Sequence, residues 1–230
     1  MKSRTFNTLF MLSSVDGKIS TGSIDQRDVD KDLPKIKGVV EGLKQYYDLE
    51  MRTDLHSFNT GRVMAKIGMN KKKKEIVKLP VSFIIVDNKP HLNNIGLDNL
   101  TKKCKVLYLV TTNKKHPAFK REKDNLKVIY YHKKIDFPGL FKKLRQEFDI
   151  NRVTIQSGGT MNSLLIRAGL IDELSLVIAP VLIGGKNTAT LVDGKSLISE
   201  KDLIHISALK LKKCVKLNNS YLNLVYEVLN

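Results

Sequence analysis

Continuous apolar runs alternate with amphipathic stretches along most of this chain. Apolar runs rich in β-branched side chains are typical of strands covered on both faces, as in a parallel sheet. Apolar residues at helical spacing indicate helices that bury one side. The pattern predicts strands over 5–13, 55–59, 80–86, 106–110, 126–131, 153–156 and 173–179, and helices over 36–51 and 61–67, near Pro138–Phe148, and from Gly158-Gly159 to the stop at Gly169.

The pattern changes near the C-terminus. Two further strands are expected over 204–214 and 221–229, joined through the turn Asn218-Asn219-Ser220. Strand–helix alternation followed by an antiparallel hairpin predicts an α/β fold with one mixed, mostly parallel sheet flanked by helices. Because no repeat and no linker rich in Gly, Ser and Pro interrupts the chain, a single domain over 1–230 is expected.

The most informative segment runs from Val153 into Ile166. An apolar strand leads into Gly158-Gly159, which open an amphipathic helix. The first backbone N–H groups of a helix have no intrahelical partners and carry partial positive charge. The segment therefore predicts a site for an anion, above all a phosphate.

Polar loops follow several predicted strands, and in a mostly parallel sheet ligands bind beyond the carboxyl ends of the strands. We expect these loops to converge on one cleft. Each loop alone also has an ordinary explanation as a turn, a helix start or a loop cap. The Rossmann and P-loop glycine spacings are absent, so a dinucleotide would be held by another scheme. The loops are Ser13–Lys18, Thr60–Arg62, Val86–Lys89 and Gln156–Thr160.

The composition gives a formal net charge of +17 over 230 residues. Such a charge raises the possibility of nucleic-acid binding. The lysines are nevertheless scattered, and the densest run, Lys71–Lys74, falls in a predicted loop without a recognised nucleic-acid motif. We therefore favour a lysine-rich surface that also attracts phosphorylated small ligands.

The two cysteines, Cys104 and Cys214, have no metal-type spacing and no histidine cluster beside them. Buried reduced thiols are expected, and no metal site. No apolar run is long enough to span a membrane, and the first residues lack a signal-peptide pattern. A cytoplasmic protein without membrane partners is expected.

Several short motifs together resemble one family. Ser14–Ile19 is similar to its S-x-D-G-K-hydrophobic signature, Gly61–Met64 to a G-R-x-T element, and Val86–Lys89 to V-D-S-K. The longest match comprises Gln156–Thr160, Gly169–Leu174, Ala179-Pro180, Gly184–Lys186 and Val192–Gly194. These residues resemble the reductase domain of riboflavin biosynthesis, the C-terminal domain of the bacterial bifunctional deaminase–reductase, which shares the dihydrofolate reductase fold.

This resemblance implies a three-layer, NADPH-dependent reductase, typically a homodimer. Its substrate would be phosphorylated, resembling 5-amino-6-(5-phosphoribosylamino)uracil, and hydride would reach C1 of its opened sugar. The resemblance implies catalytic roles for Asp16 and Lys18 and substrate contacts for Ser14 and Gln156. It implies cofactor contacts for Gly61, Arg62, Val86, Asp87, Asn88, Lys89, Ser157, Gly158, Gly159, Thr160 and Met161. Thr111 and Thr112, after another strand, are the expected contacts of the 2′-phosphate.

The chain departs from the family pattern at informative places. Gln156 replaces the glutamate before Gly-Gly, and Ala65–Asn70 stands where D-D-P-x-L is expected. The zinc motif of the deaminase is absent, and the sequence has no Trp. Two alternatives therefore stay open: a reductase of the same fold for another small carbonyl, imine or pterin, and a basic nucleic-acid-binding protein.

Overall fold

The structure is a computed structural model that describes residues 3–229 of the chain. Its internal contacts group into two compact units. Unit 1 is built from Asp54–Ser157 and the described residues up to Thr5; unit 2 is built from Phe6–Thr53 and the described residues from Gly158 onward.

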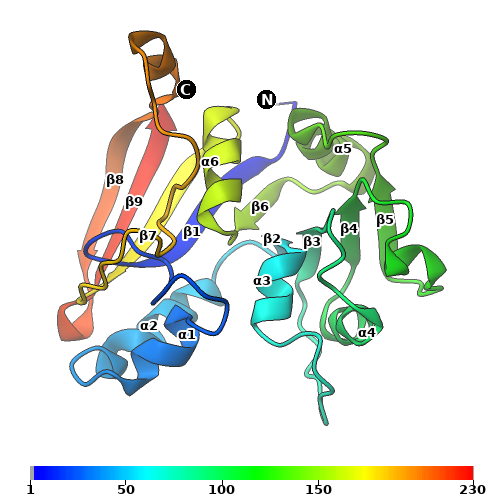
Figure 1. Ribbon diagram of the computed structural model, residues 1–230, viewed down its shortest axis with the longest axis horizontal. Helices are drawn as coiled ribbons and strands as arrows, with labels where there is room; N and C mark the ends of the chain where they lie inside the picture. The colour runs from blue at the N-terminus through cyan, green and yellow to red at the C-terminus, as the bar shows by residue number, and fades with distance from the viewer. Residues whose placement is uncertain (1–2, 230) are drawn as a thin grey trace. The chain divides into compact units, whose positions relative to one another are not determined.

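Unit 1 is a parallel sheet with helices. Its strands follow the order β5-β4-β3-β2-β6, and each neighbouring pair is parallel. Figure 1 shows this sheet together with its helices. The strands are β2 (His56–Thr60), β3 (Ser82–Val86), β4 (Leu107–Thr111), β5 (Leu126–Tyr130) and β6 (Arg152–Ile155); the helices are α3 (Gly61–Lys66), α4 (Asn94–Lys103), α5 (Phe137–Phe148) and the 3-10 turn η2 (Pro117–Lys120).

The apolar side chains of β4 face both ways, as in a sheet covered on two sides. Leu107 and Leu109 join the core cluster that contains Leu97 and Leu100 of α4. Tyr108, which alternates with them, packs its ring 5.0 Å from that of Phe148 in α5. Because successive side chains of a strand point to opposite faces, α4 and α5 cover opposite sides of this sheet.

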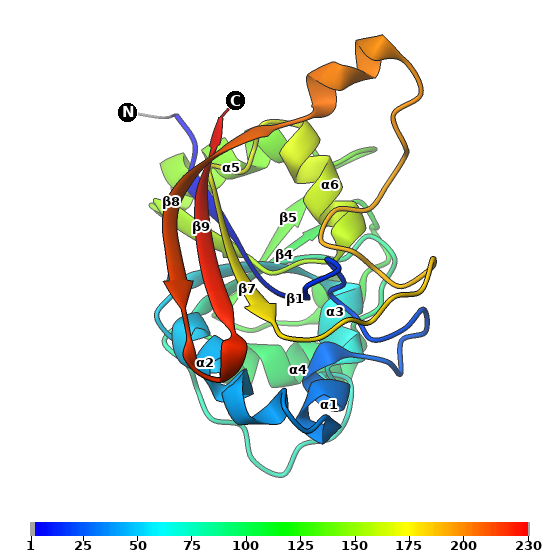
Figure 2. The same cartoon turned by 90° about the vertical axis from the view of Figure 1, so that its left-hand side faces the viewer.

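Unit 2 combines a parallel pair with an antiparallel hairpin. β1 pairs with β7 in parallel, β9 runs antiparallel to β7, and β8 is antiparallel to β9. Figure 2 shows β7, β9 and β8 side by side. The elements are β1 (Phe6–Ser14), β7 (Glu173–Ala179), β8 (Ala208–Lys216), β9 (Leu222–Leu229), α1 (Val29–Asp32), α2 (Val40–Glu50), α6 (Gly159–Arg167) and the 3-10 turns η1 (Leu33–Lys35), η3 (Glu200–His205) and η4 (Asn218–Ser220).

The core of unit 2 joins α2 to its sheet. Phe10 of β1 stacks on Tyr46 of α2 with ring centroids 5.2 Å apart. Tyr221 is fully buried, and its hydroxyl donates a 2.7 Å hydrogen bond to the carbonyl of Val39. The turn before β9 is thereby fixed against the start of α2.

The predicted α/β class is confirmed, with mostly parallel strands and a C-terminal antiparallel hairpin. Helix α4 was missed, because its polar residues and Gly96 weaken the apolar periodicity. The helix expected over 36–51 begins only at Val40, because 36–39 form a bend and a turn in which Gly38 has φ of 84°. The strand expected from 204 begins at Ala208, because Ser199 and Asp202 form a capping box that starts η3.

The prediction of two buried thiols is half right. Cys104 is buried, but Cys214 is exposed because it lies on β8, whose residues are nearly all exposed. Neither of these described cysteines forms a disulfide. Lys71–Lys74 lie in an exposed loop, as predicted. Within residues 3–229, no helix has the length and apolar character needed to cross a membrane.

Candidate functional site

One candidate site is the carboxyl edge of the sheet in unit 1. Because β2, β3, β4 and β6 are parallel, the residues that follow them meet at one edge. These residues are Gly61-Arg62, Asp87–Lys89, Thr112 and Gln156-Ser157. The expected cofactor residues of unit 1 thus gather at one edge, although they come from distant parts of the sequence.

Gly61 marks the closest approach between two of these loops. Thr60 caps α3 by accepting a hydrogen bond from Val63 N–H. A Cβ placed on Gly61 would clash with the carboxylate of Asp87. The absence of a side chain at Gly61 therefore lets α3 begin directly against the loop that follows β3, while Arg62 is exposed.

The carboxylate of Asp87 is buried and accepts several hydrogen bonds. His91 N–H and Leu92 N–H donate to it at 3.1 and 3.0 Å. The rings of His91 and His116 reach it at 2.9 and 3.1 Å. Burial would raise the pKa of the Asp87 carboxyl, but the hydrogen bonds from His116, Leu92 and His91 outweigh it and hold this pKa below its usual value. Asp87 is an ionised internal acceptor.

The other expected cofactor residues of unit 1 differ in their exposure. Val86 and Thr111 are buried, and the Thr111 hydroxyl donates to the carbonyl of Asp87 at 2.8 Å. Asn88 and Lys89 are exposed, and Asn88 Oδ1 accepts from Thr112 N–H at 2.9 Å. The side chains that this edge presents to a ligand are therefore those of Asn88 and Lys89 rather than that of Asp87.

Gln156 continues the pairing of β6 with β2. Its N–H donates to the carbonyl of Phe58 at 3.0 Å, and its Oε1 accepts from the Ser57 hydroxyl at 3.3 Å. The side chain is half-buried, and the following Ser157 is buried. The neutral amide is thus oriented by a neighbouring strand at the end of β6.

A second candidate site lies in unit 2, beyond the parallel strands β1 and β7. The Ser14 hydroxyl donates to Asp16 at 2.6 Å, and the N–H groups of Ile183 and Gly184 donate to the same carboxylate at 3.1 and 2.6 Å. The hydrogen bonds from Ser14, Ile183 and Gly184 lower the pKa of Asp16 to about 2. Asp16 is therefore ionised at neutral pH and holds two loops together.

Lys18 is fixed in the same loop cluster. Its N–H donates to the Ser14 hydroxyl at 2.8 Å, and its Nζ donates to the carbonyls of Gly185 and Thr188 at 2.9 and 3.2 Å. An ammonium group has three donors, so these two contacts orient the cation and leave one N–H to point elsewhere. The side chain is half-buried.

The start of α6, also in unit 2, is the third candidate site. A Cβ on Gly158 would meet no atom of the described chain within 4 Å, whereas one on Gly159 would clash with Thr190 and Asp193. Asp193 N–H donates to the carbonyl of Gly159 at 3.1 Å. Thr160 is exposed and Met161 is half-buried. The helix start is therefore packed on the 190–193 segment at Gly159 and open at Gly158.

Sequence reasoning missed residues that support these loops. His116 and His91 hold Asp87, and Thr190 donates its hydroxyl to Asp193 at 2.6 Å. Their partners lie far along the chain or in irregular segments, and no local pattern pointed to them. Among the described residues, no group of His, Cys, Asp and Glu has the arrangement of a metal site.

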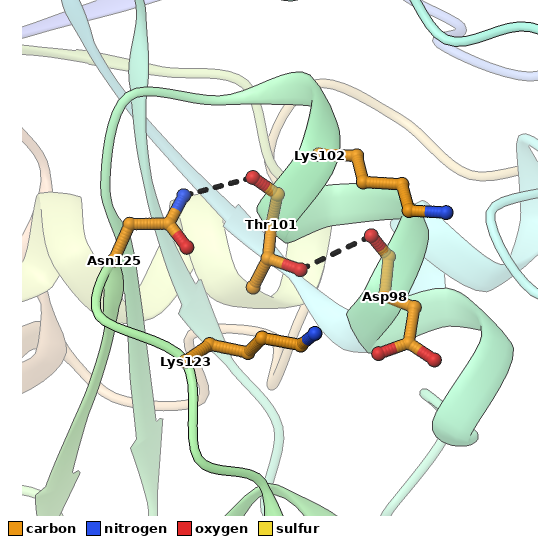
Figure 3. A pocket seen from close by; sticks show the side chains of 5 residues that line it. All are labelled: Asp98, Thr101, Lys102, Lys123 and Asn125. Carbon is orange, nitrogen blue, oxygen red and sulfur yellow. Dashed lines mark hydrogen bonds between the residues drawn. The ribbon is translucent and has the colours of Figure 1, made fainter.

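A separate recess of about 160 Å³ lies at the opposite, amino-terminal edge of unit 1, beside the residues that precede β5. Figure 3 shows its lining, with the Asn125 amide donating to the carbonyl of Thr101 at 2.8 Å. The recess therefore lies away from the carboxyl ends of the strands. Its lining residues are Asp98, Thr101, Lys102, Lys123 and Asn125.

The fold defines an α/β protein of the dihydrofolate reductase-like class, with its loops at the carboxyl ends of parallel strands. A sequence profile of the family described as the RibD C-terminal domain matches residues 5–222, and the chain belongs to this family.

Two kinds of relative accompany this match. A 2,5-diamino-6-ribosylamino-4(3H)-pyrimidinone 5′-phosphate reductase of Methanothermobacter thermautotrophicus is 32% identical over 74 residues, which are 32% of this chain and 34% of that protein. The riboflavin biosynthesis protein RibD of Bacillus amyloliquefaciens is 35% identical over 60 residues, 26% of this chain and 16% of that protein. The alignments therefore span about a third or less of these relatives.

Solved structures of other proteins have a fold similar to that of the whole chain. RibD of Acinetobacter baumannii matches with a TM-score of 0.68 and 15% identity, covering 100% of this chain and 59% of that one. The riboflavin biosynthesis reductase Rib7 of Saccharomyces cerevisiae matches with a TM-score of 0.63 and 17% identity, covering 100% of this chain and 92% of that one.

Proposed function

We propose that this protein is an NADPH-dependent reductase that acts on a phosphorylated ribosylaminopyrimidine of riboflavin biosynthesis. The observation that carries the proposal is the gathering of Gly61-Arg62, Asp87–Lys89 and Gln156-Ser157 at one edge of a parallel sheet, in a chain whose family match spans 5–222. Relatives named as reductases of such a pyrimidine phosphate support the choice of substrate class.

The residues at these loops fit a dinucleotide phosphate. Arg62 and Lys89 are exposed cations at the carboxyl edge of unit 1. Gly158, which has open space at its Cβ position, precedes the N-terminus of α6, whose first turn carries no acidic side chain of its own. Backbone N–H groups and cations are the usual partners of phosphate oxygens. In this proposal Ser157–Met161 hold the diphosphate, and Thr112 lies near the 2′-phosphate.

NADPH supplies the hydride, so this chain has to orient the substrate and manage a proton. We assign substrate contact to Gln156 and the catalytic loop to Asp16 and Lys18. The predicted substrate residue Ser14 is buried, and its hydroxyl is bound to Asp16 and to Lys18 N–H, so we assign it the role of holding this loop. Asp16 is ionised and bound by three donors, which suits an orienting role. Lys18 keeps one donor beyond its two carbonyl contacts, which suits a contact with the sugar phosphate or a proton donor.

The same proposal includes the organisation of the protein: the two units act as one domain, and two copies form a cytoplasmic homodimer. The support for pairing is β8, an edge strand whose Leu209 and Leu211 are 45% and 53% exposed. An exposed apolar edge strand favours association with another chain. Light scattering after size exclusion should give twice the 26.0 kDa chain mass; a monomer at micromolar concentration would contradict the dimer.

The experiment that tests the function combines binding with turnover. NADP at 100 times its Kd should stabilise the protein by about 2.7 kcal/mol, seen as a rise in Tm. NADPH oxidation should then be followed with the ribosylaminopyrimidine phosphate, its dephosphorylated form and dihydrofolate. Turnover with only the phosphorylated pyrimidine is the expected result. Absence of both a thermal shift and NADPH binding would reject the reductase.

One observation favours a second candidate, a reductase of this fold for another carbonyl, imine or pterin. Gln156 presents a neutral amide, fixed by Ser57, where the family pattern has a carboxylate. Turnover of dihydrofolate or of a simple imine, without turnover of the pyrimidine, would select it.

The exposed Lys71–Lys74 loop is the feature that would favour nucleic-acid binding. That alternative requires binding to nucleic acid that weakens steeply as the salt concentration rises.

A further inference from the structure

Each of the two oxygens of the buried Asp87 carboxylate has two hydrogen-bond partners. Oδ1 accepts from the N–H and the ring Nδ1 of His91, at 3.1 and 2.9 Å. Oδ2 accepts from Leu92 N–H at 3.0 Å and lies 3.1 Å from Nε2 of His116. The side chains of Asp87 and His116 are both fully buried, whereas that of His91 is 38% exposed. Of the two ring contacts, the one with His116 is therefore the one that water cannot replace.

The hydrogen-bond network assigns the tautomer of His116. Its Nδ1 accepts a hydrogen bond from Ala118 N–H at 3.1 Å, so this nitrogen carries no proton. The ring proton is then on Nε2, which donates to Asp87. Both ring nitrogens are used, and His116 is a neutral imidazole that links the turn η2 to the loop after β3.

This link lies under the loops expected to hold the cofactor. The Thr111 hydroxyl donates to the Asp87 carbonyl and accepts from Asn113 N–H at 3.1 Å. Asn88 then accepts from Thr112 N–H. The residues after β3 and those after β4 are thus bound to each other at several points, with Asp87 and His116 as the buried members.

We propose that His116 is a positioning residue of the cofactor-binding edge, which acts through Asp87 to hold the loop that presents Asn88 and Lys89. This inference rests on the proposed function. The side chains of Asp87 and His116 are both too buried to contact a dinucleotide. Their role is to fix the backbone from which those side chains project.

The loss of the Nε2 donor should loosen this loop. With His116→Phe, Asp87 Oδ2 keeps only Leu92 N–H, and a buried anion without its full set of donors shifts its surroundings to find others. Small displacements of binding groups are costly for ligands. We expect the Kd for NADPH, measured by its fluorescence, to rise roughly tenfold, while kcat at saturating NADPH stays within about twofold of the wild type.

Two companion variants distinguish positioning from general destabilisation. His116→Gln keeps an amide N–H and should restore most of the affinity. Asn125→Ala removes the amide that donates to the carbonyls of Thr101, Cys104 and Lys105, so it destabilises the same unit at the opposite edge of the sheet. Asn125→Ala should lower Tm and leave the Kd for NADPH unchanged. In the free His116→Phe protein, the amides of Leu92 and Ala118 should also exchange faster.

The possible outcomes separate the two proposals. A wild-type protein that does not bind NADPH rejects the proposed function and this inference with it. If the wild type binds and His116→Phe binds equally well, the positioning role is wrong and the reductase stands. If His116→Phe does not fold, His116→Gln is compared with the shorter His116→Asn; equal affinities for NADPH would reject the role, and weaker binding by His116→Asn alone would support it.

Discussion

The carboxylate of Asp193 lies directly against Gly159, the first residue of α6, and leaves no room for a side chain there. A 3.1 Å hydrogen bond from Asp193 N–H to the carbonyl of Gly159 also joins these two residues. The segment that holds this helix start is fixed in turn by Asn162, whose amide donates to the carbonyl of Leu191 at 2.9 Å. The glycine pair that suggested a phosphate site thus consists of two residues with different roles.

Gly159→Ala should destabilise the protein. The new Cβ would overlap Thr190 and Asp193, and overpacking of this kind costs about 1–3 kcal/mol. Gly158→Ala is the matched control, because Gly158 has φ of −75° and open space around its Cβ position. Urea unfolding should show a lower midpoint for Gly159→Ala only. Equal midpoints for the two variants would mean that the 190–193 segment moves to make room for the new Cβ without loss of stability.

The stability of the protein should fall in acid partly through Asp16. Its folded pKa of about 2 lies below the usual value of 3.8, so the stabilisation is complete above pH 4 and is lost as pH falls toward 2. Asp16→Asn should be less stable at neutral pH and show a flatter dependence between pH 4 and 2. The measurement is the urea midpoint at several pH values. Parallel curves for the two proteins would contradict the role of this carboxylate.

Lys18→Met should reduce turnover more than cofactor binding. The variant keeps most of the volume of the side chain but loses the cation held by the carbonyls of Gly185 and Thr188. If Lys18 handles a proton, kcat should fall about 10²-fold, and the Kd for NADPH should stay unchanged. Lys72→Met, in the exposed lysine loop, is the control. An unchanged kcat would show that Lys18 has no catalytic role.

The two thiols should differ strongly in reactivity toward a disulfide reagent. Burial raises the pKa of the Cys104 thiol to about 11, so little thiolate is present at neutral pH, whereas Cys214 is exposed on β8. One thiol should react quickly in the native protein and the second only after unfolding. Cys214→Ser should abolish the fast phase; fast labelling that persists in this variant would show that Cys104 is accessible.

Local patterns were sufficient for much of the fold. The strand expected over 173–179 is β7 as observed, and Pro138 lies in the first turn of α5, where its missing N–H has no cost. These elements have strong periodicity and clear start or stop signals. α4 has a cap at Asn93 but a weak apolar periodicity, because Asn94, Asp98 and Asn99 are distributed around it, and its burial arises from packing with β3 and β4. Its helical state became evident only from the structure.

The sequence by itself determined the residue types that the strand-end loops carry, because glycines, cations and turn residues are local properties of the chain. The tertiary structure decided what each of them does. Asp16 became a link between two loops by accepting a hydrogen bond from Gly184 N–H, which is 168 residues away in the sequence. Asp87 is buried and bound to His116, while Asn88 and Lys89 of the same loop are exposed. Burial and hydrogen-bond partners depend on contacts between distant segments, and only the folded chain brings those segments together.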